Sequence, residues 1–352
     1  MNYTCSPAAW ENPVFRTNNF GFTASRKNRA GAMPVAFLVF YLVMTSCYAE
    51  SPVFQLADTH IHYRFSSAIK PAITVPSGAI VIADLKDSAD GQVGRSSVPD
   101  DLRKLDMNRV HPLTGPVFVE GAEPGDTLAV TLLRIEPGKW GWSALVPDFG
   151  ALAEDFTGYY LRKFELGDAT SIKFNERVRL PLQPFPGLMG VAPATDEMLT
   201  TMPPRENGGN MDEPDIREGT TVYFPVFVSG ALFSMGDGHA VQGRGEVSGP
   251  ALEIPMRVTY RIEVIKGRLP IKEPQYENDT YYAVISSAVS LDEAAKRAVR
   301  YMVDYLVAYH DLSPQDAYML CTLAGDLMIN ELPNKPNVSM TMRIPKDVLG
   351  IR

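Results

Sequence analysis

Short runs of apolar residues, many of them alternating with polar ones, dominate the chain between residues 71 and 267. Val, Ile, Tyr and Phe are frequent in these runs, and Pro and Gly stand between them, so each run predicts one or two β-strands bounded by turns. The clearest runs are PAITVPSGAIVIADL (71–85), GPVFVEGAEPGDTLAVTLLRIE (115–136), TTVYFPVFVSGALFSMGD (220–237) and LEIPMRVTYRIEVIKG (252–267).

The period of the pattern changes in the last quarter of the chain. Apolar residues recur every three or four positions over residues 291–309, which predicts a helix, and Ser290 and Glu293 form a capping box at its start. A second helix is expected over residues 314–329, because Ser313 is a good N-cap and is followed by a proline.

A final strand is expected in NVSMTMRIP (337–345), after the two helices. Strands first and helices late favour a mainly β or α+β fold over a doubly wound α/β sheet. We expect a β-sandwich or barrel-like core of short strands with a C-terminal helical segment. At 352 residues, the chain suits one large domain or two intimately packed β-rich halves.

The N-terminus has the order of regions found in a secretory signal peptide. Arg26, Lys27 and Arg29 precede the apolar run AFLVFYLVM (36–44), and small and polar residues follow up to Ala49. We expect residues 1–49 to be removed and residues 50–352 to be exported to the periplasm or the extracellular space, with no membrane contact after cleavage. Lipid attachment at Cys47 and an unprocessed membrane anchor are the alternatives.

Cysteine usage and overall charge add two constraints. Of Cys5, Cys47 and Cys321, only Cys321 remains after cleavage near Ala49, so no internal disulfide is expected, and its place in a predicted helix indicates a core residue. The formal net charge is −8, and the body of the chain has no basic run interleaved with aromatic residues, which argues against nucleic acid as a partner. A homo-oligomer is left open.

The segment MGDGHAVQGRGE (235–246) is the first candidate site. Asp237 and His239 are two positions apart, so in an extended segment they project to the same face, and carboxylate plus imidazole suits Zn²⁺. The glycine-rich arc beyond them could return Gln242 and Glu246 to the same point. A hydrogen-bonded turn with a solvated acid is the alternative.

A second polar cluster lies in PPRENGGNMDEPD (203–215). The amides of Gly208 and Gly209 could turn toward one point and hold an oxyanion, with Asn210 and Asp212 beside them. The alternative is an Asx-type turn before a strand. Asp87, which follows an apolar strand in DLKDSADGQV (84–93), is by itself typical of a solvated turn.

The HxH pair formed by His60 and His62 is typical of metal-dependent amidohydrolases built on a barrel of alternating strands and helices. The middle of this chain lacks that alternation, and a barrel site needs further histidines and an aspartate on later strands. We therefore do not expect that fold.

Taken together, the motifs resemble those of the acetamidase/formamidase family. The resemblance spans residues 55–350 almost completely and is most specific in the GGNxD and GDxHAxQGxGE patterns. The matching segments are His62-x-x-Phe65 with Pro71, DSADGQV (87–93), PLTGPVFVEGAEPGDTL (112–128), WGW (140–142), PFPGLMGVAP (184–193), PPRENGGNMD (203–212), GALFSMGDGHAVQGRGEVSGPALE (230–253) and LSPQDAYMLCTLAGDL (312–327). One departure is His111, where many relatives have Asn.

The resemblance implies a β-rich hydrolase that cleaves short-chain amides such as formamide and acetamide to carboxylate and ammonia, with a divalent metal, Zn²⁺ or alternatively Ca²⁺. A hydrolase for a lactam or a larger amide, and a non-catalytic periplasmic binding protein, are the other hypotheses. The implied metal ligands are His239, Asp237, Asp87 and His62, and the implied catalytic residues are Glu246 as general base and acid, Asn210 at the carbonyl oxygen, Asp212 and Gln242. The roles of Glu246 and Asp87 could be exchanged.

The walls of a substrate pocket are harder to predict. Phe185, Met189, Trp140 and Trp142 could enclose a small apolar pocket, but each is also typical of a hydrophobic core.

Overall fold

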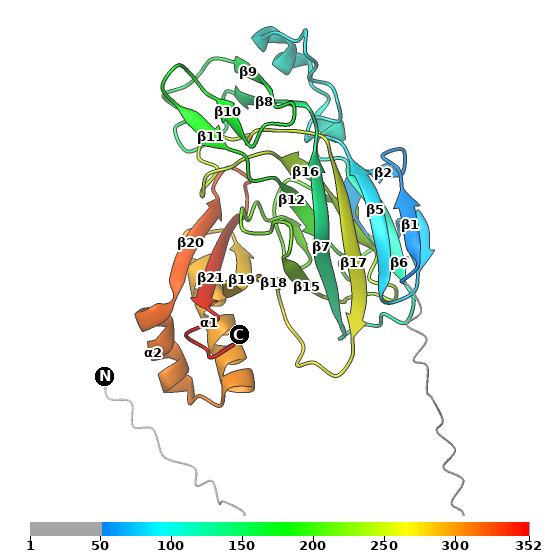
Figure 1. Ribbon diagram of the computed structural model, residues 1–352, viewed down its shortest axis with the longest axis vertical. Helices are drawn as coiled ribbons and strands as arrows, with labels where there is room; N and C mark the ends of the chain where they lie inside the picture. The colour runs from blue at the N-terminus through cyan, green and yellow to red at the C-terminus, as the bar shows by residue number, and fades with distance from the viewer. Residues whose placement is uncertain (1–50, 352) are drawn as a thin grey trace, which may run out of the picture. The chain divides into compact units, whose positions relative to one another are not determined.

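Two β-sheets share one hydrophobic core in residues 51–351, the part of the chain that this computed structural model describes (Figure 1). The larger sheet has nine strands, and its outer strands, β1 and β20, are not paired to each other, so it does not close into a barrel. In spatial order the strands are β1 (Val53–Leu56), β5 (Ala79–Leu85), β17 (Met256–Ile265), β7 (Thr127–Pro137), β15 (Thr221–Pro225), β18 (Gln275–Glu277), β19 (Tyr281–Ala288), β21 (Val338–Pro345) and β20 (Asp326–Glu331).

The second sheet has six strands, and three further strand pairs and two short 3₁₀ helices lie outside both sheets. Its order is β14 (Gly208–Asn210), β12 (Phe185–Gly190), β16 (Phe233–His239), β6 (Leu113–Val119) and β2 (Ile61–His62), with β4 (Ile73–Val75) also paired to β6. The pairs are β8 (Trp140–Leu145) with β9 (Tyr160–Glu165), β10 (Ser171–Lys173) with β11 (Arg179–Pro181), and β3 (Arg64–Phe65) with β13 (Leu199–Thr200), and the 3₁₀ helices are η1 (Pro99–Lys104) and η2 (Met107–Arg109).

The core lies between the two sheets, where alternating strands turn their apolar faces toward each other. Strand β17 shows this alternation. Its residues Val258, Tyr260 and Ile262 point into the core and are buried, whereas Arg257 points away from it and is exposed. The ring of Phe233 on β16 packs against the ring of Tyr260, with 5.6 Å between centroids, and so joins the sheets. The predicted mainly β fold with a sandwich-like core is confirmed.

Two helices cover the part of the larger sheet formed by β19 and β21. Helix α1 (Leu291–His310) begins as predicted, since the Ser290 hydroxyl accepts a hydrogen bond from the amide of Glu293. Helix α2 (Pro314–Ala324) is capped by Ser313 and buries Cys321 in the core between helices and sheet, which confirms both predictions.

The predicted end of the second helix is wrong by five residues. We expected residues 314–329 to be helical, but α2 ends at Ala324, and the segment from Asp326 pairs with β21 as β20. Gly325 ends the helix with its amide bonded to the carbonyl of Cys321, and the hydrogen bonds to β21 then outweigh the helical pattern.

The predicted signal peptide, residues 1–49, lies outside the described residues. No helix within residues 51–351 is long and apolar enough to cross a membrane. The described strands and helices belong to one compact unit.

Candidate active site

Strand β16 carries the two central side chains of the site, Asp237 and His239. Gly236 and Gly238 alternate with them, and a Cβ on Gly238 would lie 2.5 Å from the carbonyl oxygen of Ile254. These glycines therefore let neighbouring backbone approach one face of the strand, while the acid and the imidazole occupy the other. Asp237 Oδ1 lies 3.2 Å from His239 Nε2, so the predicted juxtaposition is present.

Glu253 completes a buried group around the same imidazole nitrogen. Its Oε1 lies 3.4 Å from His239 Nε2, and it is 1% exposed. An isolated β-bridge between His239 and Glu253 fixes the two backbones beside each other. Asp237, His239 and Glu253 are close enough for one metal ion to contact all three, with their ligand atoms within 4.8 Å of one another.

The other imidazole nitrogen is occupied by Gln242. His239 Nδ1 lies 2.8 Å from Gln242 Oε1, and Gln242 Nε2 donates to the carbonyl oxygens of Asp212, at 3.0 Å, and Asn330, at 3.3 Å. Because the amide nitrogen is used by two carbonyls, the amide oxygen faces the ring and requires a proton on Nδ1. Nε2, which faces Asp237 and Glu253, is thus the ring nitrogen that can give up its proton and bind a cation.

Asp212 and Glu246 form the second acidic group, on the Nδ1 side of the ring. Asp212 Oδ1 lies 4.0 Å from His239 Nδ1, and Asp212 Oδ2 accepts a hydrogen bond of 2.6 Å from Asn334 Nδ2. Glu246 Oε1 accepts from the amide of Ala251 at 3.1 Å. Asp212, His239 and Glu246 also meet the distance condition for a metal site, but the hydrogen bond to Gln242 occupies Nδ1.

The backbone holds four of these residues in an unusual conformation. His111, Asp212, Asp237 and Glu246 have φ angles of 56°, 45°, 57° and 44°, in the left-handed region that side chains other than glycine rarely adopt. Such residues persist only where the surrounding structure fixes them, and they concentrate at functional sites.

Gly187 on β12 makes room for the cluster. A Cβ there would lie 2.6 Å from Asp212 Oδ1 and 2.7 Å from His239 Cε1. The close approach of the two acidic groups to one imidazole therefore depends on the missing side chain.

The charges in the cluster affect one another strongly. Burial raises the pKa of Asp212 to about 7, and burial also raises the pKa values of Glu246 and Glu253. Burial opposes ionisation of both His239 and Asp237, but the carboxylates around the ring raise the pKa of His239, and the imidazoles of His239 and His111 lower that of Asp237.

A bound cation would relieve this excess of buried negative charge. Three carboxylate oxygens in the cluster are buried without a hydrogen-bond partner among the described residues: Asp212 Oδ1, Asp237 Oδ1 and Glu253 Oε2. Unpaired buried acceptors are costly, and carboxylates with an imidazole are suitable ligands for a divalent ion. The residues present therefore fit a divalent cation.

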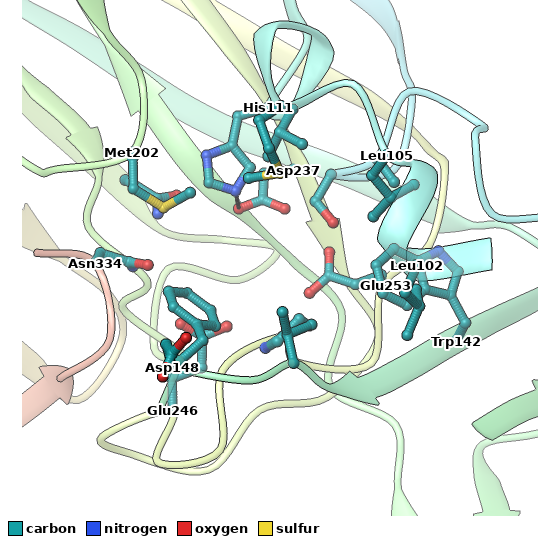
Figure 2. Close-up of a pocket in the computed structure, with 18 of the residues that line it drawn as sticks. Leu102, Leu105, His111, Trp142, Asp148, Met202, Asp237, Glu246, Glu253 and Asn334 are labelled. Atoms are coloured by element: carbon teal, nitrogen blue, oxygen red, sulfur yellow. Dashed lines mark ion pairs between the residues drawn. The ribbon is translucent and has the colours of Figure 1, made fainter. Parts of the chain in front are cut away.

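The cluster opens on a cavity of about 380 Å³ (Figure 2). Asp237 and Glu253 project into it, with Asn334 and Met202 on one side and Leu102, Leu105 and Trp142 on the other. The polar residues that line it are Ser88, His111, Asn210, Asp212, Asp237, Glu246, Glu253 and Asn334, together with Asp148 and Arg103. Its volume is in the range of small-molecule sites.

Two of the implied metal ligands do not join the cluster. Both ring nitrogens of His62 are engaged elsewhere: Nδ1 donates to the carbonyl of Arg64 at 2.7 Å, and Nε2 of the neutral ring accepts from the hydroxyl of Ser234 at 2.8 Å. The carboxylate of Asp87 accepts from the amides of Ala89 and Gly91, so it caps a turn. The structure brings together Asp237 and His239 from that set, but neither His62 nor Asp87.

The predicted amide nest at Gly208 and Gly209 is wrong. The amide of Gly208 donates to the carbonyl of Arg205, and the backbone of both glycines lies in β14, paired with β12. Their φ angles of 92° and 88° serve this tight turn and strand. Asn210 remains, because it lines the cavity and its Oδ1 is buried without a hydrogen-bond partner within residues 51–351.

Glu253 and Asn334 belong to the site but to neither of the two patterns, GGNxD and GDxHAxQGxGE, that predicted it. Glu253 is an acid at the start of an otherwise apolar run, directly before Ile254, and that break in the pattern was the available signal. Asn334 had no signal of its own. His111 was noted only as a departure; its Nε2 lies 4.0 Å from Asp237 Oδ2.

Of the four aromatic and sulfur-containing residues considered as pocket walls, only Trp142 lines the cavity. Phe185 and Met189 are fully buried, and the ring of Phe185 packs edge-on against that of His239, with 5.1 Å between centroids. Phe185 therefore supports the imidazole from behind.

A sandwich of two β-sheets with a buried cluster of acids and an imidazole, open to a cavity, has the features of a hydrolytic or metal-binding β protein. The model of the Acetamidase/Formamidase family matches residues 50–200 and 194–350. The chain therefore belongs to the Acetamidase/Formamidase family.

Individual relatives agree with this assignment. A formamidase of Methylophilus methylotrophus is 26% identical, over 83% of this chain and 90% of the relative, and an acetamidase of Mycolicibacterium smegmatis is 30% identical, over 58% and 66%. The crystal structure of a predicted acetamidase/formamidase from Thermoanaerobacter tengcongensis is similar with a TM-score of 0.81 and 37% identity, covering 86% of this chain and 99% of that structure.

Proposed function

We propose that this protein hydrolyses the C–N bond of primary amides, giving a carboxylate and ammonia. The family assignment makes the chain an amidohydrolase of the acetamidase/formamidase type. The observation that carries the proposal is the cluster of buried acids around His239 at the wall of a cavity large enough for an amide. Formamide and acetamide, named by the relatives, are the first substrates to test.

We also propose that Asp237, His239 and Glu253 hold a divalent cation, with Zn²⁺ favoured over Ca²⁺ because one ligand is an imidazole. His239 Nε2 is the atom left for it, since Gln242 holds Nδ1. When bound, such a cation would act as a Lewis acid toward water and the amide carbonyl.

The remaining acids carry the protons of the reaction. We assign Glu246 as the general base that takes a proton from water while the water oxygen attacks the carbonyl carbon. The same proton then passes to the amide nitrogen as the C–N bond breaks, and ammonia leaves. Asp212, whose pKa is raised to about 7 by burial, can share that proton at neutral pH, and the side-chain amide of Asn210 orients the substrate.

Ammonia release tests the proposal. Purified protein is incubated with formamide, acetamide and propionamide, before and after chelation and with Zn²⁺ or Ca²⁺ restored. Turnover by the untreated protein, its loss on chelation and its recovery with one metal are expected. Metal-loaded protein that releases no ammonia from any of them would contradict the proposal and favour a binding protein.

The N-terminal pattern supports a further proposal, that the enzyme is exported and loses residues 1–49. Mass spectrometry of the protein recovered from the periplasm or medium measures its first residue. A protein that keeps the segment before Ala49, or carries lipid on Cys47, would contradict simple secretion.

A further inference from the structure

The end of the cavity opposite Asn334 is formed by a hydrophobic cluster that is separate from the core between the sheets. Trp142 and Leu102 are its buried centre, at 4% and 5% exposure, and Leu105, Val146 and Tyr159 are partly buried against it. Figure 2 shows Leu102, Leu105 and Trp142 together beyond Glu253. The reacting groups therefore face an apolar chamber.

Two segments far apart in the chain build this chamber. The 3₁₀ helices η1 and η2 and the turn between them contribute Leu102, Leu105 and Met107, and the segment after β8 contributes Val146 and Phe149. Met107 lines the cavity although 61% of its surface is exposed. Exposed apolar side chains at the mouth of a pocket are typical of a site for an apolar ligand.

The cavity as a whole, acidic end and chamber together, is larger than the amides named by the relatives require. An apolar cavity of about 150 Å³ in a protein admits benzene, a molecule of six heavy atoms. The cavity here measures about 380 Å³, and acetamide has only four heavy atoms. Acetamide would fill the polar end and leave the surfaces of Leu105 and Met107 in contact with water, without binding energy from them.

The charges also restrict what the chamber accepts. Asp212, Asp237, Glu246 and Glu253 line the polar end, so a substrate with a carboxylate on its acyl group would be repelled there. Among residues 51–351, Arg103 is the one Lys or Arg that lines the cavity, and its exposed guanidinium stacks over the ring of Tyr159, 4.5 Å from its centre.

We propose that the preferred substrates are primary amides with an uncharged apolar acyl group larger than propionyl, linear or aromatic, which packs against Leu102, Leu105 and Trp142. This inference rests on the proposed amidase function. The amide group then lies at the acidic cluster and the acyl group in the chamber.

A substrate series measures the preference directly. We compare kcat/KM for ammonia release from formamide, acetamide, butyramide, hexanamide and phenylacetamide, using protein expressed from the full sequence. Each buried methylene should raise kcat/KM about fourfold, so hexanamide should exceed acetamide by at least about 30-fold. Values that are highest for formamide or acetamide and fall with length would overturn the inference and leave the amidase function standing. No ammonia from any amide would overturn both.

Substitutions in the chamber wall test whether the acyl group binds there. Leu105→Trp fills the chamber and should lower the ratio of kcat/KM for hexanamide to that for acetamide at least tenfold. Leu152→Trp is the matched control, because Leu152 is 57% exposed and does not line the cavity. Met107→Trp repeats the test at an exposed position should Leu105→Trp fail to fold. If neither Leu105→Trp nor Met107→Trp changes the ratio, the acyl group does not bind in the chamber, and the assigned location is wrong.

Discussion

The hydrogen bond of 2.8 Å between His239 Nδ1 and Gln242 Oε1 fixes a proton on Nδ1 and leaves Nε2 facing Asp237 and Glu253. Gln242 is itself fixed by donating to the carbonyls of Asp212 and Asn330, so the geometry of the ring depends on three separate segments. Partners of this kind set the tautomer and orientation of a ligating histidine.

Gln242→Ala should weaken binding of Zn²⁺ by about 10- to 100-fold and lower amidase activity at limiting metal, because the ring loses its tautomer and its orientation. Competition with a chromogenic chelator measures the affinity independently of activity. Gln315→Ala, at an exposed position of α2 that does not line the cavity, should leave the affinity unchanged. Equal affinities in both variants would show that Gln242 does not orient the ligand.

Gly187→Ala should lower kcat by about 100-fold or more, because the added Cβ displaces Asp212 and His239, and displacements near 1 Å have effects of that size. Gly158→Ala is the matched control, since a Cβ at Gly158 meets no atom within 4 Å. Rates and circular dichroism are measured on both. Normal activity in Gly187→Ala would show that the cluster tolerates a wider spacing.

Glu331 should make the protein less stable in alkaline solution. It is fully buried, and burial, followed by the charge of Asp212, raises its pKa from 4.5 to about 9. Between these pH values the folded state keeps a proton that the unfolded state has lost, so the free energy of unfolding falls as pH rises through this window.

Glu331→Gln removes the titrating group and should flatten this dependence. Between pH 5 and pH 8, the free energy of unfolding of the variant should fall by less than that of wild type, and the two falls should differ by about 1 kcal/mol or more. Urea denaturation at pH 5, 6.5 and 8 measures the effect, with Glu176→Gln at an exposed position as control. Parallel pH dependences of wild type and Glu331→Gln would contradict the prediction.

The part of the site that could be predicted from sequence lies close together in the chain. Asp237 and His239 share one strand, and Gln242 and Glu246 follow in the same glycine-rich arc, so local geometry brings them together. The strands and helix starts were also predictable, since hydrophobic periodicity and caps are local signals.

The remainder depends on pairing between distant segments. Glu253 reaches His239 only through a β-bridge, and Asn334 reaches Asp212 across 122 positions of the chain. Pairing with a distant strand also explains the mispredicted end of α2. The segment from Asp326 has a helical pattern of apolar residues, but it pairs with β21 and forms a strand. The resemblance to a family gave a catalytic role to Asp212, which the glycine-rich cluster had already placed beside Asn210. It also suggested His62 and Asp87, whose hydrogen bonds lie outside the cluster.

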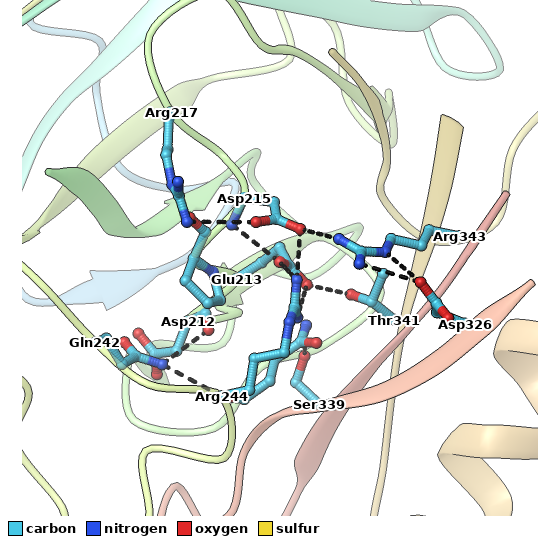
Figure 3. A network of polar contacts seen from close by, with 12 residues as sticks. Asp212, Glu213, Asp215, Arg217, Gln242, Arg244, Asp326, Ser339, Thr341 and Arg343 are labelled. Carbon is cyan, nitrogen blue, oxygen red and sulfur yellow. Dashed lines mark hydrogen bonds and ion pairs between the residues drawn. The ribbon is translucent and has the colours of Figure 1, made fainter. Parts of the chain in front are cut away.

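A network of ion pairs ties the loop after β16 to the C-terminal strand (Figure 3). Arg244 donates to Glu213 at 2.8 and 3.1 Å and to Asp215 at 2.6 Å, and Arg343 on β21 donates to the same Asp215 oxygen. Thr341 on β21 also bonds to Glu213. Since Glu213 follows Asp212 directly, the network anchors the acidic cluster to the helical side of the fold.

Arg244→Met should destabilise the fold by about 3–5 kcal/mol, because the carboxylate of Glu213 is fully buried and would lose its main cation. Glu213→Gln combined with Arg244→Met should recover part of that loss, since the uncompensated charge is then absent. Lys104→Met, which breaks an exposed pair with Asp101, should leave stability unchanged, because solvent screens that pair. Urea denaturation of the four proteins measures these differences. A double variant no more stable than Arg244→Met would mean that the geometry of the Arg244 fork, rather than the buried charge of Glu213, accounts for the stabilisation.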